Sequence, residues 1–259
     1  MLLGARVRLP ESHNEGADFA WGQQAYGPLQ VTRDYLSGPV PSRYVDRFPP
    51  STQVILSLKS VDGPLSDFLW SLDTRSVSRL VFQHEPERPN LFSSGDDFVR
   101  QFDAARAKIK AIRPEIQVGI ASSGFNYRGS RPGADGSYLS KQADFYTIDT
   151  YRAGTDENAS SNGVVPIDQR PEIMRWYALV KDRGKPLGIT EVGMGRVGGG
   201  ADPATPADRV EVVAHDVAWA RAHGFFCYSY FLSGQGPDGH NWLDDSAAFQ
   251  AMYRALPRG

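Results

Sequence analysis

The feature of this sequence that most constrains its fold is a series of eight apolar, strand-forming segments spread along the whole chain. These segments are almost continuously apolar rather than alternating, which is typical of parallel strands that are covered on both faces. Their spacing leaves room for a helix after most of them. We therefore expect parallel strands at Leu3–Arg8, Leu29–Tyr35, Val54–Lys59, Arg79–His84, Ile116–Ser122, Phe145–Tyr151, Leu187–Glu191 and Phe225–Phe231.

Amphipathic segments with clear start and stop signals lie between several of these strands. In the segment that begins at Asp97, apolar residues recur at helical spacing, with acids at its start and lysines near its end. Gly184 and Gly224 directly follow two other segments, in the position that glycine favours after a helix. Helices are predicted over Asp97–Ile112, Glu172–Arg183, Thr205–His223 and Asp244–Leu256.

Eight strand–helix units predict an α/β protein with a single (β/α)8 TIM barrel that spans residues 1–259 as one domain. The length suits this fold, because such barrels commonly have about 250 residues. The alternative for alternating strands and helices is an open, doubly wound sheet, which usually has a glycine-rich phosphate-binding turn after an early strand. Here the first strand runs into Pro10-Glu11-Ser12-His13-Asn14, so the barrel is favoured.

Charge and composition argue against several kinds of partner. The formal net charge of −2 offers no basic excess for nucleic acid or for an anionic membrane surface. No apolar run approaches the roughly 20 residues of a membrane-spanning helix, and Leu2–Val7 is too short for the core of a signal peptide. Cys227 is the only cysteine, and its apolar strand predicts a buried, unreactive thiol. We expect a monomer that binds neither nucleic acid nor a membrane.

Two of the strand-like segments end abruptly in a carboxylate beside proline or glycine. Glu85 follows the fourth expected strand, and Glu191 ends the seventh, 106 residues later. Parallel strands of one barrel bring their carboxyl-terminal ends to the same rim, where catalytic side chains are usually found. A pair of carboxyl groups about 5–5.5 Å apart is the apparatus of a retaining glycosidase, whereas an inverting enzyme separates them by roughly 6.5–9.5 Å. We expect the shorter separation here.

The segments around the two glutamates also resemble clan A of the glycoside hydrolases. Those (β/α)8 enzymes have their acid/base residue after strand four and their nucleophile after strand seven. Most clan members have asparagine before the acid/base, whereas His84-Glu85 resembles the family 26, β-mannanase-like group. Short motifs carry the similarity along the chain: Val81-Phe82-Gln83-His84-Glu85-Pro86-Glu87, Pro186-Leu187-Gly188-Ile189-Thr190-Glu191-Val192-Gly193, and Tyr230-Phe231 with Asn241-Trp242-Leu243-Asp244.

The resemblance implies a retaining glycoside hydrolase that cleaves O-glycosidic bonds in an oligo- or polysaccharide without a cofactor. Glu85 would be the acid/base and Glu191 the nucleophile. We therefore expect a raised pKa for Glu85, from burial and the Glu191 anion, and an ionised Glu191. Short loops favour an open groove and internal cleavage. The substrate class points to extracellular or virion-associated action, although the sequence does not fix the location. A mannan, a mixed-linkage glucan, a galactan or an envelope glycan would all fit.

Polar and aromatic residues at other strand ends are candidates for binding the substrate. We expect His84 to hydrogen-bond a sugar hydroxyl, and Tyr151 to contact Glu191, as a tyrosine after strand six often does in clan A enzymes. Glu87 is the rival for the acid/base role. The predicted substrate-binding set is His84, Tyr151, Asp149, Arg33, Lys59, Tyr230, Trp242 and Glu87.

The aromatic residues are divided between stacking on sugars and filling the core. Tyr151, Tyr230, Trp242 and Trp21 are predicted to stack on the apolar faces of sugar rings. Trp70 and Trp176 lie in helical segments and are assigned to the core.

Three alternative functions were weighed against the sequence. A metal hydrolase would need clustered ligands, but the five histidines include no His-x-His or His-Glu-x-x-His, so no metal site is expected. A serine hydrolase would show Gly-x-Ser-x-Gly, of which Ala121-Ser122-Ser123-Gly124 is only a weak echo. A non-catalytic, glycan-binding barrel of a surface or phage-tail assembly stays open as the main alternative. The presence of both glutamates argues against it.

Overall fold

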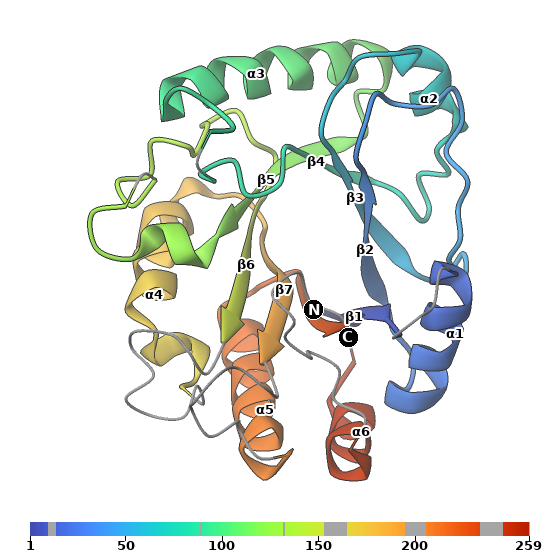
Figure 1. Ribbon diagram of the computed structural model, residues 1–259, viewed down its shortest axis with the longest axis vertical. Coiled ribbons are helices and arrows are strands. Elements are labelled where there is room, and N and C mark those ends of the chain that lie inside the picture. The colour runs from blue at the N-terminus through green and yellow to red at the C-terminus, as the bar shows by residue number, and fades with distance from the viewer. Residues whose placement is uncertain are drawn as a thin grey trace.

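Eight parallel strands close into one barrel in the computed structural model of the protein, with β8 pairing with β1 (Figure 1). Each strand also pairs in parallel with the next one along the chain, which confirms the predicted TIM barrel. The structure describes residues 1–9, 14–88, 90–131, 133–152, 165–194, 206–233 and 246–258. The strands are β1 (Leu2–Arg8), β2 (Val31–Leu36), β3 (Gln53–Leu58), β4 (Arg79–Phe82), β5 (Gln117–Ser123), β6 (Tyr146–Arg152), β7 (Leu187–Met194) and β8 (Cys227–Ser233).

The interior of the barrel is apolar towards the strand starts and polar towards the strand ends. A separate buried cluster of Val31, Ile55, Val81, Ala121, Phe145 and Cys227 fills the first part. Successive side chains on a strand alternate between its faces, so residues two positions further along point inwards again. There the chain supplies Arg33 after Val31 and Ser57 after Ile55. The polar layer of the interior therefore lies at the rim where the sequence places the two glutamates.

Helices surround the barrel, and a second, larger apolar cluster fills the space between strands and helices (Figure 1). The predicted helices correspond to α3, α4, α5 and α6, while the first residues expected for two of them, Thr205 and Asp244, lie outside the described residues. The helices are α1 (Glu15–Tyr26), α2 (Leu65–Ser71), α3 (Gly95–Ile112), α4 (Pro171–Val180), α5 (Pro206–Ala222) and α6 (Ala247–Ala255), with short 3-10 turns η1 (Gly124–Tyr127), η2 (Ile167–Gln169) and η3 (Lys181–Arg183).

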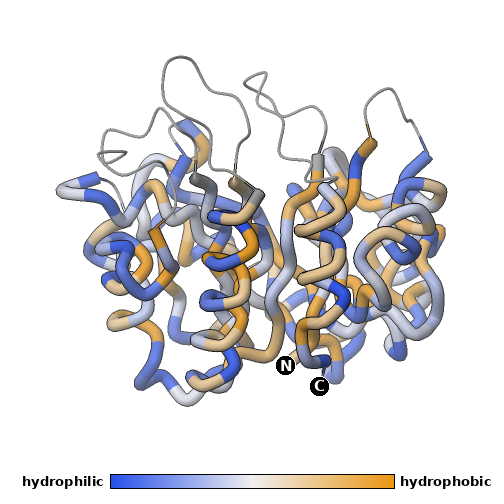
Figure 2. The backbone as a smooth tube through the Cα atoms, turned by 90° about the horizontal axis from the view of Figure 1, so that it is seen from below, coloured by the Kyte–Doolittle hydropathy of each residue, from blue (hydrophilic) through white to orange (hydrophobic). Residues whose placement is uncertain are grey.

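The termini meet at the end of the barrel where the strands begin. Figures 1 and 2 show the N and C termini side by side, and the Tyr253 hydroxyl of α6 donates a hydrogen bond to the carbonyl of Gly4 in β1. Gly184 ends the α4–η3 segment with a left-handed φ of 65°, as its predicted position after a helix requires. No helix within the described ranges is long and apolar enough to cross a membrane.

Three expectations about individual core residues have clear outcomes. Cys227 is buried, and burial raises the pKa of its thiol to about 12, so the predicted unreactive thiol is confirmed. Trp176 is fully buried, as predicted. The assignment of Trp70 to the core is wrong, because it is 65% exposed on α2, with the Arg113 guanidinium 4.6 Å from its ring centre.

Candidate active site

The turn after β4 presents Glu85 in a left-handed backbone conformation. β4 ends at Phe82, and the next residues include Gln83 and Glu85 with φ angles of 53° and 51°. Each such conformation costs a residue other than glycine about 1–3 kcal/mol, and it persists only where the surroundings enforce it. Here the amide of Gln83 donates to the carbonyl of Leu58 (2.8 Å) and the amide of Glu85 donates to that of Ala121 (2.7 Å). The turn is thereby tied to β3 on one side and to β5 on the other.

The carboxyl group of Glu85 is buried but faces positive charge. Arg88, three residues later and 60% exposed, forms an ion pair with Glu85 Oε2, and His84 Nε2 lies 3.4 Å from the same oxygen. Burial alone would raise the pKa of Glu85. The hydrogen bond and charge of His84, together with Arg88 and Arg33, outweigh burial and lower it. The expected raised pKa of Glu85 is therefore wrong.

A β-bulge in β7 directs Glu191 into the barrel. Along β6 and β7, Ile148 pairs with Ile189 but Asp149 pairs with Glu191, so Thr190 is an extra residue. The pairing of β7 with β8 shifts at the same place. Regular alternation would put Thr190 and Glu191 on opposite faces of the strand, whereas a bulge re-aims one of them. Both side chains consequently contact Arg33 inside the barrel.

A fully buried charge network lies beneath Glu191. Arg33 of β2 reaches across the barrel and donates from Nη1 to both carboxylate oxygens of Asp149 on β6, at 2.7 and 2.5 Å. Thr190 Oγ1 accepts from Arg33 (3.2 Å) and donates to Asp149 (2.7 Å), while Ser57 accepts two further Arg33 hydrogen bonds. The side chains of Arg33 and Asp149 have no exposed surface. These two predicted substrate-binding residues therefore hold each other and support Glu191.

Glu191 makes a different contact with each carboxylate oxygen. The Tyr151 hydroxyl donates to Oε2, which confirms the predicted contact, and Arg33 Nη1 lies 3.5 Å from Oε1. Oε1 has no hydrogen-bond donor within the described part of the chain. Burial raises the pKa of Glu191, and the opposing charges of Arg33 and Arg6 do not cancel that effect. The pKa of Glu191 is thus raised and that of Glu85 lowered.

The same network connects the ends of β4 and β7. Ligand atoms of His84, Glu85 and Asp149 all lie within 4.8 Å of one another, and Asp149 is bonded to the Arg33 that also lies beside Glu191. Such a cluster could in principle hold a cation. It does not fit one well, because Arg88 and Arg33 already compensate its two carboxylates. The arrangement instead brings Glu85 beside Asp149, whose partner Arg33 lies 3.5 Å from Glu191.

Glu87, the rival to Glu85, points towards a different strand. Its side chain is buried, with the Ser123 amide 3.3 Å from Oε2 and the Tyr127 hydroxyl 3.5 Å from Oε1. Burial raises the pKa of Glu87 to about 7, although hydrogen bonds from its own backbone amide, Ser122 and Ser123 oppose this. Glu87 is therefore a buried acid beside β5, outside the Arg33 network.

The remaining residues predicted to bind the substrate have different surroundings from those of the two glutamates. Tyr230 is fully buried and packs against Phe249 of α6, with ring centres 5.1 Å apart, so its prediction as a stacking residue is wrong. Its side chain points out of the barrel, as the alternation of β8 requires. Trp21 packs edge-on against Tyr26 of the same helix, α1, with ring centres 5.6 Å apart. Lys59 is exposed just after β3, where its carbonyl accepts a hydrogen bond from the Gln83 side chain. Trp242 lies outside the described residues.

Three rim residues were missed by the sequence analysis. Tyr35 packs its ring 5.3 Å from that of His84, Arg88 pairs with Glu85, and Phe125 is 49% exposed just after β5. Their positions in the sequence could have indicated them, because all three lie within three residues of an expected strand end or of Glu85. Nothing in their residue types distinguished them from ordinary loop residues.

Comparison with known proteins identifies the fold. No protein-family model matches the chain, and no curated protein matches it. Among solved structures, a glucosidase from Croceicoccus marinus matches with a TM-score of 0.61 and 15% identity over 98% of this chain and 68% of its own. A GH128 (subgroup I) endo-beta-1,3-glucanase from Amycolatopsis mediterranei, in complex with laminaripentaose, matches with a TM-score of 0.58 and 14% identity over 99% of both chains. An endo-1,4-beta-mannanase from Eisenia fetida has the same TM-score and identity over 99% and 91%. The chain shares their barrel fold.

Proposed function

We propose that this protein is a retaining glycoside hydrolase of the clan A type, with Glu191 as the nucleophile and Glu85 as the acid/base. The observation that carries this proposal is the cluster at the rim. The carboxyl groups at the ends of β4 and β7 both lie beside the Arg33–Asp149 pair, in a barrel whose parallel strands bring these ends together. The glucanase and mannanase with the same fold support the same class of reaction.

In the first step, Glu191 attacks the anomeric carbon of the substrate. Tyr151 holds Oε2, so Oε1 is the oxygen with a lone pair available to form the new C–O bond. The glycosidic bond breaks as this ester forms, and the proton of Glu85 passes to the leaving oxygen. Arg33 and Asp149 fix the position of Glu191 from beneath, and the bulge at Thr190 fixes its direction.

In the second step, water replaces the leaving group. Glu85, now ionised, takes a proton from the water, which attacks the anomeric carbon and releases Glu191 as a carboxylate. Each step inverts the anomeric carbon, so the product keeps the configuration of the substrate. This mechanism requires the carboxyl separation of about 5–5.5 Å that the sequence predicts.

Glu85 is preferred to Glu87 as the acid/base because of its neighbours. Glu85 and Asp149 belong to the group of ligand atoms within 4.8 Å, and Asp149 shares Arg33 with the nucleophile. Glu87 is instead held at the end of β5 by Ser123. The raised pKa of Glu87 makes it a buried acid, but its position directs that proton away from Glu191.

The substrate we propose is a polysaccharide cleaved internally. The test is release of reducing ends from a panel of mannan, β-1,3-glucan, mixed-linkage glucan and galactan, with Glu191→Ala as the matched control. Release by the wild type and none by the variant supports the proposal. Binding of a glycan with no release by either protein would favour the non-catalytic, glycan-binding barrel.

A further inference from the structure

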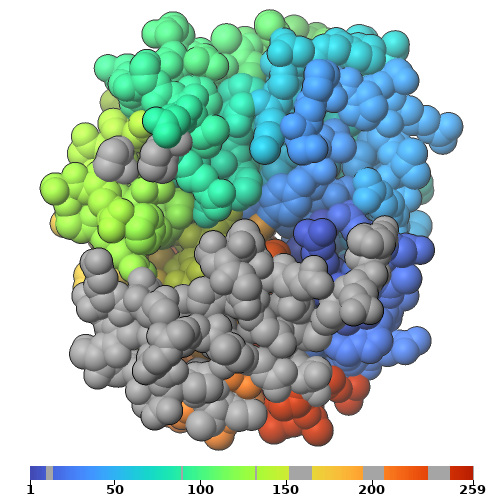
Figure 3. Space-filling view, viewed as in Figure 1, coloured from blue at the N-terminus to red at the C-terminus, as the bar shows by residue number. Residues whose placement is uncertain are grey.

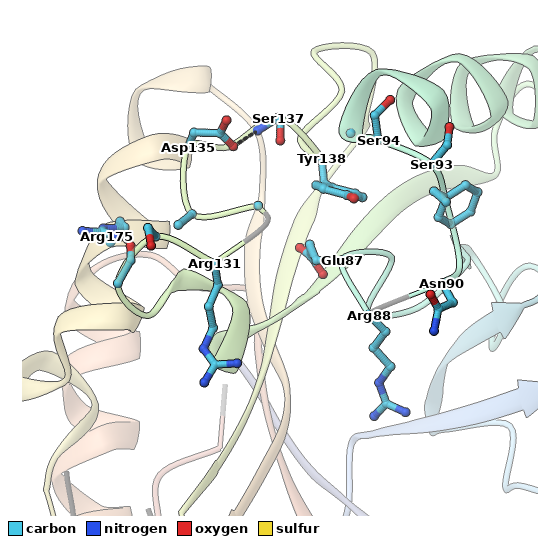
Figure 4. Close-up of a pocket in the computed structure, with 16 residues that line it drawn as sticks. Glu87, Arg88, Asn90, Ser93, Ser94, Arg131, Asp135, Ser137, Tyr138 and Arg175 are labelled. Carbon is cyan, nitrogen blue, oxygen red and sulfur yellow. Dashed lines mark hydrogen bonds between the residues drawn. The ribbon is translucent and has the colours of Figure 1, made fainter. Parts of the chain in front are cut away.

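A pocket of about 860 Å³ lies beside the turn that carries Glu85 (Figure 4). The segment after β4 forms one wall with Glu87 and Arg88, and the segment after η1 forms another with Arg131 and Tyr138. In Figure 3 these two segments, teal and green, adjoin each other on the face that is turned to the viewer. Gly133 keeps the walls close, since a Cβ atom there would lie 2.7 Å from the Cγ of Glu87.

The charged groups in the lining are mostly positive and exposed. Arg88, Arg131 and Arg175 all line the pocket and are exposed, and Figure 4 shows Arg131 and Arg88 extending in the same direction on either side of Glu87. Two acids oppose them. Hydrogen bonds from Ser137 lower the pKa of Asp135, which is therefore ionised, whereas Glu87 is buried with a pKa raised to about 7. In the lining, three arginines thus face one full and one partial negative charge, and one of them, Arg88, is also paired with the Glu85 carboxylate beside the pocket.

Arg131 is also arranged to recognise a sugar. Its guanidinium carbon lies 3.8 Å from the ring centre of the exposed Phe125. This stacking holds the guanidinium flat while its edge stays available, and a planar guanidinium binds carboxylate and sulfate oxygens in a two-pronged geometry. The aromatic rings in the lining itself are Phe92 and Tyr138. Aromatic rings and an arginine edge together match the two surfaces that an acidic sugar presents, an apolar ring face and an anionic substituent.

Arg88 connects the pocket to the proposed acid/base. It lines the pocket and at the same time pairs with Glu85 Oε2. A general acid must carry its proton when substrate binds, and a guanidinium on the carboxylate opposes that. Because Arg88 is 60% exposed, its side chain can turn to another anion without disturbing the core.

We propose that this pocket binds an anionic substituent, a carboxylate or a sulfate, on the leaving-group side of a glycan, and that this anion draws Arg88 away from Glu85. The leaving-group side follows from the position of the pocket, which adjoins the proton donor after β4 rather than the nucleophile on β7. The proposal rests on the proposed glycosidase function and narrows its substrate to acidic glycans.

The test measures binding to Glu191→Ala, which should bind glycans without cleaving them. Affinity electrophoresis would use three acidic glycans: hyaluronan, polymannuronate and carrageenan. Each is paired with its neutral form, carboxyl-reduced for the first two and desulfated for the third. We expect at least about tenfold tighter binding of one acidic form than of its neutral partner, because charge-assisted hydrogen bonds are lost on neutralisation. The carboxyl and sulfate pairs identify which anion is recognised.

Two arginine variants and a matched control localise the effect. Arg88→Ala and Arg131→Ala, each combined with Glu191→Ala, should lose the preference for the acidic form. Arg75→Ala removes another exposed arginine, which pairs with Asp73 away from the pocket, and it should keep the preference. Equal binding of acidic and neutral forms, no binding of any acidic form, or a preference that survives both pocket variants would overturn the proposal.

The proposed catalytic function fails in a different way. If the wild type cleaves a neutral glycan and shows no acidic preference, the glycosidase stands and the anionic pocket falls. If acidic glycans bind through Arg88 and Arg131 but the wild type releases no reducing ends from them, the pocket stands and catalysis falls.

Discussion

The two proposed catalytic carboxyl groups are held by different devices. Glu85 lies in a left-handed turn secured by backbone hydrogen bonds, and its carboxylate contacts His84 and the exposed Arg88. Glu191 lies on a bulged strand, above an arginine and an aspartate that are fully buried. The groups around Glu191 are therefore held in place by the core. The Arg88 guanidinium beside Glu85 belongs to an exposed side chain, which can change its position.

This difference explains why the two pKa values depart from the order that the mechanism needs. Burial raises the pKa of Glu191, while His84, Arg88 and Arg33 lower that of Glu85. The buried network is fixed, whereas an exposed Arg88 that turns away would remove one of the charges, after that of His84, that lower the pKa of Glu85. We therefore expect substrate binding to change the pKa of Glu85, while the buried groups that hold Glu191 stay as they are.

The largest loss of activity is expected on mutation of Glu191, the carboxylate that lies above the buried Arg33–Asp149 pair. Glu191→Ala should lower turnover by roughly 10⁴-fold or more while glycan binding is largely kept, because the lost contact is a covalent bond formed only during reaction. Initial rates on the best glycan of the panel, with affinity electrophoresis on the same polymer, measure both quantities. An equal loss of binding would indicate a role in holding the substrate instead.

For Glu85, whose partner Arg88 is exposed, the loss of activity on mutation should depend on the leaving group of the substrate. Glu85→Ala should slow cleavage of a polysaccharide by roughly 10²–10⁴-fold, because the leaving oxygen no longer receives a proton. An aryl glycoside with an activated phenol needs little protonation, so its glycosylation step should suffer much less. Pre-steady-state rates on both substrates check this. If Glu87→Ala shows the leaving-group pattern and Glu85→Ala does not, the assignment within His84-Glu85-Pro86-Glu87 is wrong.

The buried framework should matter for stability as well as for activity. Arg33→Ala leaves Asp149 as an uncompensated buried charge and should reduce the free energy of unfolding by about 3–5 kcal/mol. Adding Asp149→Asn should recover part of the loss, which denaturant unfolding would measure. The control Arg75→Ala removes an exposed ion pair and should leave the unfolding midpoint almost unchanged. If Arg33→Ala lowered the free energy of unfolding by less than about 1 kcal/mol, the Arg33–Asp149 pair would not be important for stability.

The smallest effect concerns Glu87 and pH. Its pKa is raised from an ordinary 4.5 to about 7 by burial, so the folded protein holds a proton that the unfolded chain releases. This contribution to stability is full below about pH 4.5 and is lost as the pH rises through about 7, by roughly 3 kcal/mol in total. Glu87→Gln should flatten that part of the curve of melting temperature against pH. The exposed Glu211→Gln should follow the wild-type curve. Glu87→Gln would follow it too if the pKa of Glu87 were the same in the folded and unfolded protein, and that result would contradict the prediction.

Much of the fold follows from simple patterns in the sequence. Strands buried on both faces leave continuous apolar runs, so all eight were predicted to within a few residues, and α3 was evident from its apolar stripe. α1 has no such stripe, since it turns Asp18 and Gly22 as well as Phe19 towards the interior. Its packing depends on contacts such as the Leu9 amide with Asp18, which no periodicity shows.

The candidate site was predictable in its members but not in their geometry. Strand ends identified Glu85, Glu191 and Tyr151, because polar residues ending apolar strands meet at one rim. They also singled out Arg33 and Asp149, but as substrate-binding residues rather than as the buried ion pair that they form. The bulge at Thr190 and the left-handed turn at Glu85 are backbone features. Neither position is occupied by glycine or proline, so the sequence did not predict them. The pKa order also depends on Arg88, whose importance is visible only once the turn brings it to Glu85.

The measurement that tests the central claim most directly is azide rescue of the two alanine variants, with the products analysed by NMR. An activated aryl glycoside of the sugar identified in the panel would be the substrate. The account predicts that Glu85→Ala forms a glycosyl azide of retained configuration, because azide attacks the glycosyl ester on Glu191. Glu191→Ala should form the inverted azide, since azide then attacks the substrate directly. The opposite pairing of variants and products, or no rescue of either variant, would contradict the proposed roles of Glu85 and Glu191.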